Sequence, residues 1–221
     1  MKCLVVVAVV FFLIISDAET IERKPLKHVD SDALLADASF DPLVNVGDSG
    51  FVEIGWFPKE YWATIDIPNT PNVSIMVVVQ ADITLFGSFE FYSRDEVLRG
   101  MTVTYTRGSN RLILNPLQTA KGTHYDIFLT FIENMMAQAM GEAGKHMYFF
   151  VFNNLENGKR ILDPYEEGRL RIQLTARDGT IMYGEVETPL NALFVPRKCP
   201  NGKMAHVSWK YCPWTGVKLP D

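Results

Sequence analysis

Eight runs of β-branched and aromatic residues, each bounded by Gly, Pro, Asn or Asp, constrain the fold of this chain more than any other feature. The residue types inside the runs are typical of strands, and the bounding types are typical of turns. The runs cover residues 51–56, 61–67, 73–86, 101–106, 111–115, 147–153, 169–176 and 180–187. They predict a largely antiparallel sheet or sandwich.

The last two runs predict a hairpin. Asp178-Gly179 is typical of a type I′ turn, in which both central residues have positive φ. The register set by this turn would place Ile172 opposite Glu185, a poor pair for one apolar face. We therefore expect a bulge at Gly184 to restore the apolar alternation.

Two helices interrupt the predicted strands. Ser93 and Glu96 form a capping box and Gly100 follows as a stop, which predicts a helix of little more than one turn. A longer helix is expected from Thr123 to Gly141, and its apolar residues recur at i, i+3 and i+4. This stripe comprises Phe128, Phe131, Ile132, Met135, Met136, Ala139 and Met140. The predicted fold class is α+β, predominantly antiparallel β, with one amphipathic helix packed on one face.

Residues 1–18 are typical of a secretory signal peptide. Lys2 precedes twelve apolar residues, Leu4 to Ile15, and small residues lead to a cut after Ala18. Twelve residues of helix span about 18 Å, too little for a hydrocarbon core of about 30 Å. The sequence predicts a secreted or periplasmic protein with no transmembrane segment in the mature chain.

The mature chain is predicted to have three parts. Residues 19–50 are polar and interrupted by Pro and Gly, as in an arm or linker packed on the body. Residues 51–197 carry the strand signals and form a β-rich domain, and residues 198–221 form a C-terminal hairpin. The formal net charge is −5 and Lys and Arg form no dense patch. We therefore expect no nucleic-acid partner.

The C-terminal part contains two Cys-Pro segments, CPNGK from Cys199 and CPWTGVKL from Cys212. They resemble the knuckles, C-P-x-C-G, of a rubredoxin-like zinc ribbon, with Gly202 and Thr215 in place of the second cysteines. Structural zinc requires four ligands, so we expect no metal or other cofactor. The alternative is a zinc site with an open position, formed by Cys199, His206 and Cys212.

Cys199 and Cys212 are the two cysteines that remain after the signal peptide is removed. An even pair in an oxidising compartment favours a disulfide. The two sulfurs of the resembled zinc site would need only small backbone shifts to reach bonding distance. We predict a disulfide that staples the hairpin of residues 198–221, with a stabilisation of about 3 kcal/mol on the chain-entropy model.

Two aromatic clusters give the strongest indication of a binding surface. One lies in GWFPKEYW and the other in the C-terminal tail. In an exported β-rich protein such rings stack on sugars or fill a partner's pocket, and packing inside the protein is the alternative use. The candidate residues are Trp56, Phe57, Tyr61, Trp62, Trp209, Tyr211 and Trp214.

No established catalytic motif is present, whether a GxSxG elbow, a P-loop, HExxH or GxGxxG. The main hypothesis is therefore a secreted, non-catalytic β-rich domain that binds a protein or glycan partner. One alternative is a self-associating structural subunit of an extracellular or envelope assembly. The other is a secreted hydrolase with carboxylates from Glu185, Glu187 or Asp163, since the two glutamates share a strand face.

Overall fold

The computed structural model of the chain describes residues 21–40, 50–65, 73–118 and 124–220, without the side chains of His124 and Tyr125. The predicted signal peptide, residues 1–18, and the predicted helix start at Thr123 lie outside these residues. No helix in the described part is long and apolar enough to cross a bilayer.

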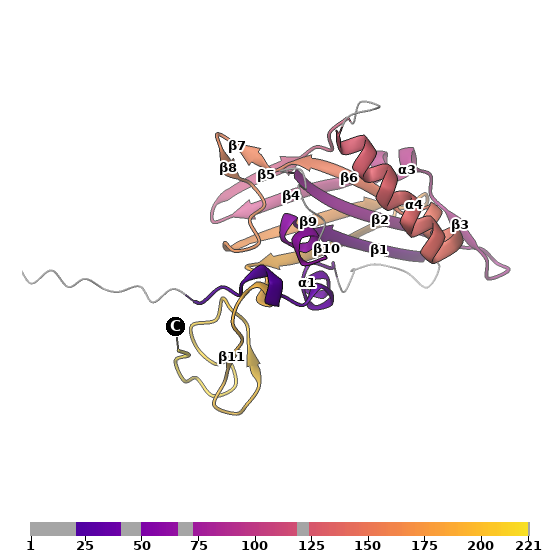
Figure 1. Cartoon of the computed structure of the whole chain (residues 1–221). Helices are drawn as coiled ribbons and strands as arrows, with labels where there is room; N and C mark the ends of the chain where they lie inside the picture. Colours follow the sequence, from indigo (N-terminus) through magenta and orange to yellow (C-terminus); the bar gives the residue numbers. More distant parts are fainter. Residues whose placement is uncertain (1–20, 41–49, 66–72, 119–123, 221) are drawn as a thin grey trace, which may run out of the picture.

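Two four-stranded antiparallel sheets form the body of the protein (Figure 1). In the first sheet, the central strand pairs with one neighbour along one edge and with two along the other. Its strands are β1 (Gly50–Phe57), β2 (Val73–Ile83), β3 (Phe89–Phe91) and β6 (Tyr148–Asn153), with β2 central. The second sheet has the order β10 (Ile181–Thr188), β9 (Gly168–Thr175), β4 (Thr102–Arg107) and β5 (Asn110–Leu114). The α+β fold with predominantly antiparallel strands is confirmed.

Shorter elements connect and flank the sheets. They are η1 (Leu26–His28), α1 (Ser31–Asp37), α2 (Lys59–Thr64), α3 (Arg94–Gly100), α4 (His124–Lys145), β7 (Leu155–Glu156), β8 (Lys159–Arg160), η2 (Asn191–Leu193), β11 (Arg197–Lys198) and β12 (Met204–Ala205). The capping box of α3 is present as predicted, because the Ser93 hydroxyl accepts from the Glu96 N–H and the Glu96 carboxylate accepts from the Ser93 N–H.

The main core lies between the two sheets, because alternate residues of each strand point inward. The first sheet contributes Ile54, Trp56, Met76, Val78, Phe150 and Phe152, and the second contributes Val103, Tyr105, Leu170, Ile172, Leu174, Met182 and Val186. The described part of the predicted arm belongs to the same core, since Leu34, Ala38 and Phe40 are buried in it. The described part of the arm, residues 21–40, is thus packed on the body.

Helix α4 covers the outer face of the first sheet (Figure 1). Its contacts with Ile75, Val77, Phe149 and Val151 are made by Phe128, Leu129, Ile132 and Met136. Phe131, Met135 and Met140 of the predicted stripe are instead exposed. The apolar residues at i, i+3 and i+4 cover a wider arc of the helix surface than the arc that touches the sheet. Only the residues nearest the sheet are therefore buried.

The predicted strand at residues 61–67 is wrong in its described part, residues 61–65, and the predicted strand at residues 73–86 ends earlier than expected. Residues 59–64 form helix α2, because Pro58 precedes a helical turn that carries Trp62 onto the outer face of the first sheet. Tertiary packing therefore overrides the strand propensity of these residues. Strand β2 ends at Ile83, and the following turn exposes Leu85 and Phe86 almost completely, at 102% and 97%.

The predicted type I′ turn between β9 and β10 is wrong. The loop has three residues, since the Ala176 N–H donates to the Thr180 carbonyl at 2.8 Å. Within it the Gly179 N–H donates to the Ala176 carbonyl at 2.9 Å, and Gly179 has a φ of 87°. Asp178 does not have positive φ, which a type I′ turn would require.

The three-residue loop shifts the register of this hairpin by one residue. The pairs on the core face become Leu170–Val186, Ile172–Gly184 and Leu174–Met182. All six residues are buried, so the predicted bulge at Gly184 is unnecessary and does not form. The same shift places Glu185 opposite Arg171 on the solvent face.

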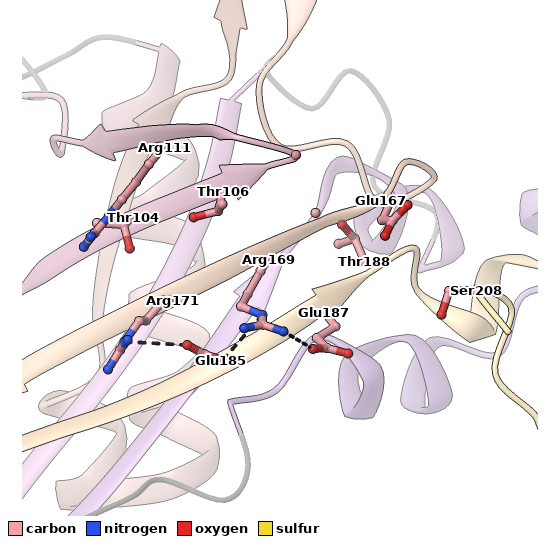
Figure 2. Close-up of a pocket in the computed structure, with 12 residues that line it drawn as sticks. Thr104, Thr106, Arg111, Glu167, Arg169, Arg171, Glu185, Glu187, Thr188 and Ser208 are labelled. Carbon is pink, nitrogen blue, oxygen red and sulfur yellow. Dashed lines mark hydrogen bonds and ion pairs between the residues drawn. The ribbon is translucent and has the colours of Figure 1, made fainter. Parts of the chain in front are cut away.

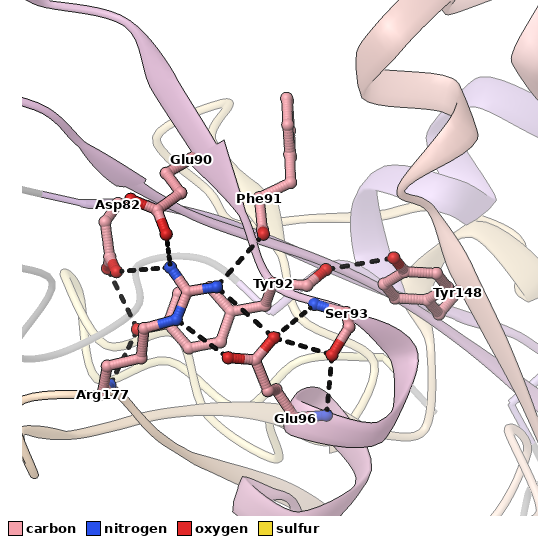
Figure 3. Close-up of polar contacts among 8 residues, drawn as sticks. All are labelled: Asp82, Glu90, Phe91, Tyr92, Ser93, Glu96, Tyr148 and Arg177. Atoms are coloured by element: carbon pink, nitrogen blue, oxygen red, sulfur yellow. Dashed lines mark hydrogen bonds and ion pairs between the residues drawn. The ribbon is translucent and has the colours of Figure 1, made fainter.

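An arginine in this loop holds the two sheets together (Figure 3). The guanidinium of Arg177 donates to Glu96 Oε1 at 2.9 Å, to Glu90 Oε1 at 3.0 Å and to Asp82 Oδ2 at 3.2 Å. It also lies 4.2 Å from the ring centroid of Tyr92. We call these five residues the Arg177 latch, because they join the β9–β10 loop to β2, β3 and α3.

The latch predicts a loss of stability in acid. Hydrogen bonds from Arg177, and then from Ser93, lower the pKa of Glu96 from 4.5 to about 2. A carboxylate whose pKa is lower in the folded state than in the unfolded state stabilises the fold at pH values above the unfolded-state pKa. This stabilisation is lost as the pH falls to the folded-state pKa. Wild type and Glu96→Gln should therefore differ in thermal midpoint above pH 4.5 and converge between pH 4.5 and 2. A difference that stays constant over this range would contradict the prediction.

Arg197, the last residue of the β-rich domain, gathers the C-terminal part, residues 198–220, around its side chain. Its guanidinium donates to the carbonyl oxygens of Val207, Trp209 and Pro220 at 2.8, 2.7 and 2.8 Å. The Val207 N–H in turn donates to Asn191 Oδ1 at 2.7 Å. These bonds fix a segment that has only a small apolar cluster of its own.

Candidate functional site

The first predicted aromatic cluster is not a surface. Trp56 and Trp62 are buried, with exposures of 1% and 3%, and this part of the prediction is wrong. The Trp56 indole N–H donates to Ser74 Oγ at 2.6 Å. Trp62 stacks on Phe57 at 5.2 Å and meets Tyr61 edge-on at 5.2 Å. The cluster packs α2 against the first sheet.

The tail aromatics are more accessible. Tyr211 and Trp214 are 60% and 49% exposed, whereas Trp209 is half-buried. Trp209 meets Trp214 edge-on at 5.6 Å, and the Lys203 ammonium lies 4.7 Å from the Trp214 ring centroid. The Lys203 side chain therefore occupies a face of Trp214 that a sugar would stack on.

Both Cys-Pro segments of the tail form tight turns, which differ in length by one residue. The Gly202 N–H donates to the Cys199 carbonyl at 2.8 Å, and the Gly216 N–H donates to the Cys212 carbonyl at 2.8 Å. Gly202 and Gly216 have φ values of 83° and 68°, which favour glycine. The segments expected to be knuckles are thus two turns, each closed by a glycine, with the turn at Cys212 one residue longer than the turn at Cys199.

Cys199 and Cys212 are free thiols in the structure, and both are buried in one small cluster. Burial raises the pKa of Cys212, but hydrogen bonds from Cys199, Thr215 and the Trp214 N–H outweigh it and lower this pKa from 9.0 to about 7. Burial raises the pKa of Cys199 to about 11. The two sulfurs are neighbours, and the disulfide stays a prediction.

The alternative zinc site at Cys199, His206 and Cys212 is not assembled. Across the described residues, no three His, Cys, Asp or Glu side chains lie close enough to hold a metal ion. His206 Nδ1 instead pairs with Ser208 Oγ at 2.7 Å.

The best candidate site is a groove on the outer face of the second sheet (Figure 2). This face lies opposite the core, and its side chains are mostly polar or charged, with Ile113, Ile181 and Tyr183 as exceptions. The groove has a volume of about 490 Å³. Its lining, which we call the polar groove, comprises Thr104, Thr106, Gly108, Arg111, Glu167, Gly168, Arg169, Arg171, Glu185, Glu187, Thr188 and Ser208.

Strand register arranges the polar groove in two rows across four strands. The first row reads Arg111, Thr106, Arg169 and Glu187 from β5 to β10. The second row reads Ile113, Thr104, Arg171 and Glu185 in the same direction. Neighbouring strands lie about 4.8 Å apart, so each row is about 14 Å long. One basic group, Arg111, thus lies on the β5 edge, two lie on β9, and the acidic groups lie along the β10 edge.

Ion pairs order the β10 side of the groove (Figure 2). Arg169 Nη2 donates to Glu187 Oε1 at 2.8 Å, and Arg169 Nε lies 3.6 Å from Glu185 Oε2. Arg171 Nε lies 3.7 Å from Glu185 Oε1, and its guanidinium stacks 4.2 Å from the centroid of Tyr183. These groups present fixed donors and acceptors on a rigid sheet.

A buried hydroxyl also borders the groove. Thr188 is 3% exposed, and its Oγ1 has no hydrogen-bond partner among the described residues. Burial raises the pKa of the Tyr105 hydroxyl, and the nearby Thr188 hydroxyl lowers it by a smaller amount. The two oxygens nevertheless do not meet hydrogen-bond geometry. Buried polar atoms are rarely left without partners, so this oxygen is available to water or a ligand.

The predicted carboxylates are only partly brought together. Glu185 and Glu187 both contact Arg169, as two acidic groups on one strand face. Asp163 belongs to a different cluster, where its Oδ1 accepts from the Tyr165 N–H at 3.0 Å and lies 3.9 Å from Arg160 Nη1.

The arginines and threonines of the groove were missed from the sequence. The alternation of Arg169 and Arg171 with apolar residues, and of Thr104 and Thr106 with Val and Tyr, assigns them to the solvent face. These residues form rows only because β5, β4, β9 and β10 are neighbours in that order, and the sequence pattern does not predict this order.

Comparison with known proteins gives no further identification. No family model, no curated protein and no solved structure matches this chain.

Proposed function

We propose that this protein is an exported, non-catalytic β-sandwich domain that binds a glycan through the polar groove. The observation that carries the proposal is the double row of hydroxyl, guanidinium and carboxylate groups that four strands hold on one open sheet face. Sugars offer many hydroxyl groups, and such groups bind best to donors and acceptors that are already fixed in place.

The composition of the groove favours a glycan over a protein partner. Stable protein interfaces have a central core enriched in aromatic and apolar residues. In the two rows Ile113 is the one large apolar residue, whereas the other seven are Thr, Arg or Glu. Most of the aromatic residues that were expected to bind a partner pack inside the protein instead. We therefore assign binding to the outer face of the second sheet.

A hydrolase remains an alternative with less support. Glu185 and Glu187 share one strand face, but both are paired with Arg169, so neither carboxylate is free of a cationic partner. A glycoside hydrolase needs one protonated carboxyl group beside the ionised one. Release of reducing sugar from a bound glycan would favour the hydrolase over the binding domain.

The double variant Thr104→Val and Thr106→Val tests the proposal. Valine keeps the β-branched shape and removes both hydroxyls, so the fold should be retained while affinity falls about tenfold for a bound saccharide. A glycan array identifies the saccharide, and calorimetry with that saccharide measures the affinity. The matched control is Thr102→Val, since Thr102 is exposed on the same strand but does not line the groove.

Two outcomes would contradict this function. The array could retain no glycan on the correctly folded protein, or the double variant could bind the retained glycan as tightly as wild type and the Thr102→Val control. Unchanged thermal midpoints in all three proteins establish that any loss of affinity arises at the groove.

A further inference from the structure

The charges of the polar groove are unevenly distributed. Its two rows contain three arginines and two glutamates, and both glutamates belong to β10 at one edge. The third glutamate of the lining, Glu167, lies outside the rows, just before β9, and Figure 2 shows it toward Thr188 and away from Arg111. Arg169 contacts both glutamates, and Arg171 reaches Glu185 at 3.7 Å. The β5 side of the groove therefore carries positive charge that these carboxylates do not neutralise.

Arg111 is the source of this uneven charge. It lies on β5 opposite Thr106, two strands from Arg169 and three from Glu187 in the same row. Within the described part of the chain, no ion pair or side-chain hydrogen bond involves its guanidinium, and its side chain is exposed beside the groove (Figure 2). Its five N–H donors are therefore available to a ligand.

From this placement we propose that the glycan is acidic and that its carboxylate or sulfate group binds at the Arg111 end of the polar groove. Arg111 and the Thr106 hydroxyl hold the acidic group, while the sugar hydroxyls extend along the row toward Arg169 and Glu187. A guanidinium matches the planar geometry of a carboxylate and can also form two parallel bonds to a sulfate. Binding in the opposite direction would bring the acidic group against Glu185 and Glu187, which repel it. This inference rests on the glycan-binding function proposed above.

Three tetrasaccharide probes test it: a neutral galactan, the same galactan with sulfate esters, and a galacturonate. Arg111→Gln should lower the affinity for the acidic probes about tenfold or more, because a charge-assisted bond is lost, and should leave the neutral probe within twofold of wild type. Affinity for the acidic probes should also fall with added salt, and less steeply in Arg111→Gln. Arg99→Gln is the matched control, since it makes the same charge change on α3, outside the groove.

The outcomes separate this inference from the proposed function. If wild type binds the neutral and acidic probes with equal affinity, the claim that the glycan is acidic is overturned, whereas the proposed glycan binding is not. Equal losses in Arg111→Gln and Arg99→Gln would overturn the role of Arg111, because they would show a general charge effect. If inorganic sulfate binds as tightly as the sulfated galactan, the claim that the ligand is a saccharide is overturned. If no probe and no array glycan binds, both proposals are overturned. The preferred acidic probe identifies whether the group is a carboxylate or a sulfate.

Discussion

Replacing Glu60 with Gln should lower the free energy of unfolding by about 3–5 kcal/mol, the cost of breaking a buried ion pair from one side. Glu60 is 7% exposed on α2, and its two carboxylate oxygens accept from Arg160 Nη1 at 2.6 Å and Nη2 at 3.1 Å. Burial lowers the pKa of Arg160, but the bonds to Glu60 outweigh it and raise that pKa. In the variant, the guanidinium stays charged and loses its bidentate partner. The thermal midpoint should fall by about 6–20 °C.

The double variant Glu60→Met and Arg160→Met distinguishes the ion pair from simple packing. Replacing both partners by apolar residues of similar size removes the unpaired charge, so stability should return to within about 1–2 kcal/mol of wild type. Urea unfolding followed by tryptophan fluorescence measures all three proteins. A Glu60→Gln variant that unfolds within 1 kcal/mol of wild type, or a double variant less stable than Glu60→Gln, would contradict this account of the pair.

Oxidation of Cys199 and Cys212 should raise the stability of the protein by about 3 kcal/mol, the chain-entropy value for a loop of this length. The two thiols lose two protons and two electrons to a small disulfide such as oxidised glutathione, which is reduced to two thiols as the new S–S bond forms. Cys212 is the better attacking group, because its hydrogen bonds lower its pKa to about 7. Both turns already bring the sulfurs into one buried cluster.

Intact mass and denaturation check this second prediction together. The protein purified without reductant should gain the mass of two hydrogens on reduction, and its urea midpoint should fall at the same time. The variant Cys199→Ser with Cys212→Ser is the control, because reductant should change neither its mass nor its midpoint. Two free thiols in the protein purified without reductant would contradict the disulfide, and bound zinc would restore the alternative metal site.

Local sequence signals predicted the local structure well. The capping box of Ser93 and Glu96 was recognised because its partners are three residues apart and need no information about the fold. The alternation of apolar residues in β9 and β10 likewise identified both strands. The class of the fold followed from these local signals.

Features that depend on pairing were predicted less well. Asp178-Gly179 fits both a two-residue and a three-residue loop, and the choice between them decides which face Glu185 occupies. Trp62 has high strand propensity but belongs to a helix, because the outer face of the first sheet buries its ring there. The polar groove brings together residues of distant strands, such as Thr104 and Glu187, which are 83 positions apart, and the proximity of these two follows from strand order alone.

The most direct test of the proposed function is an NMR titration of the folded protein with the best-bound saccharide. Amide shifts should change in a saturable manner at Thr104, Thr106, Arg169, Arg171 and Glu185, and those of α4 on the opposite face should remain unchanged. Changes centred on the exposed turn at Leu85 and Phe86, or on Tyr211 and Trp214 in the tail, would contradict the assignment of the polar groove as the binding site.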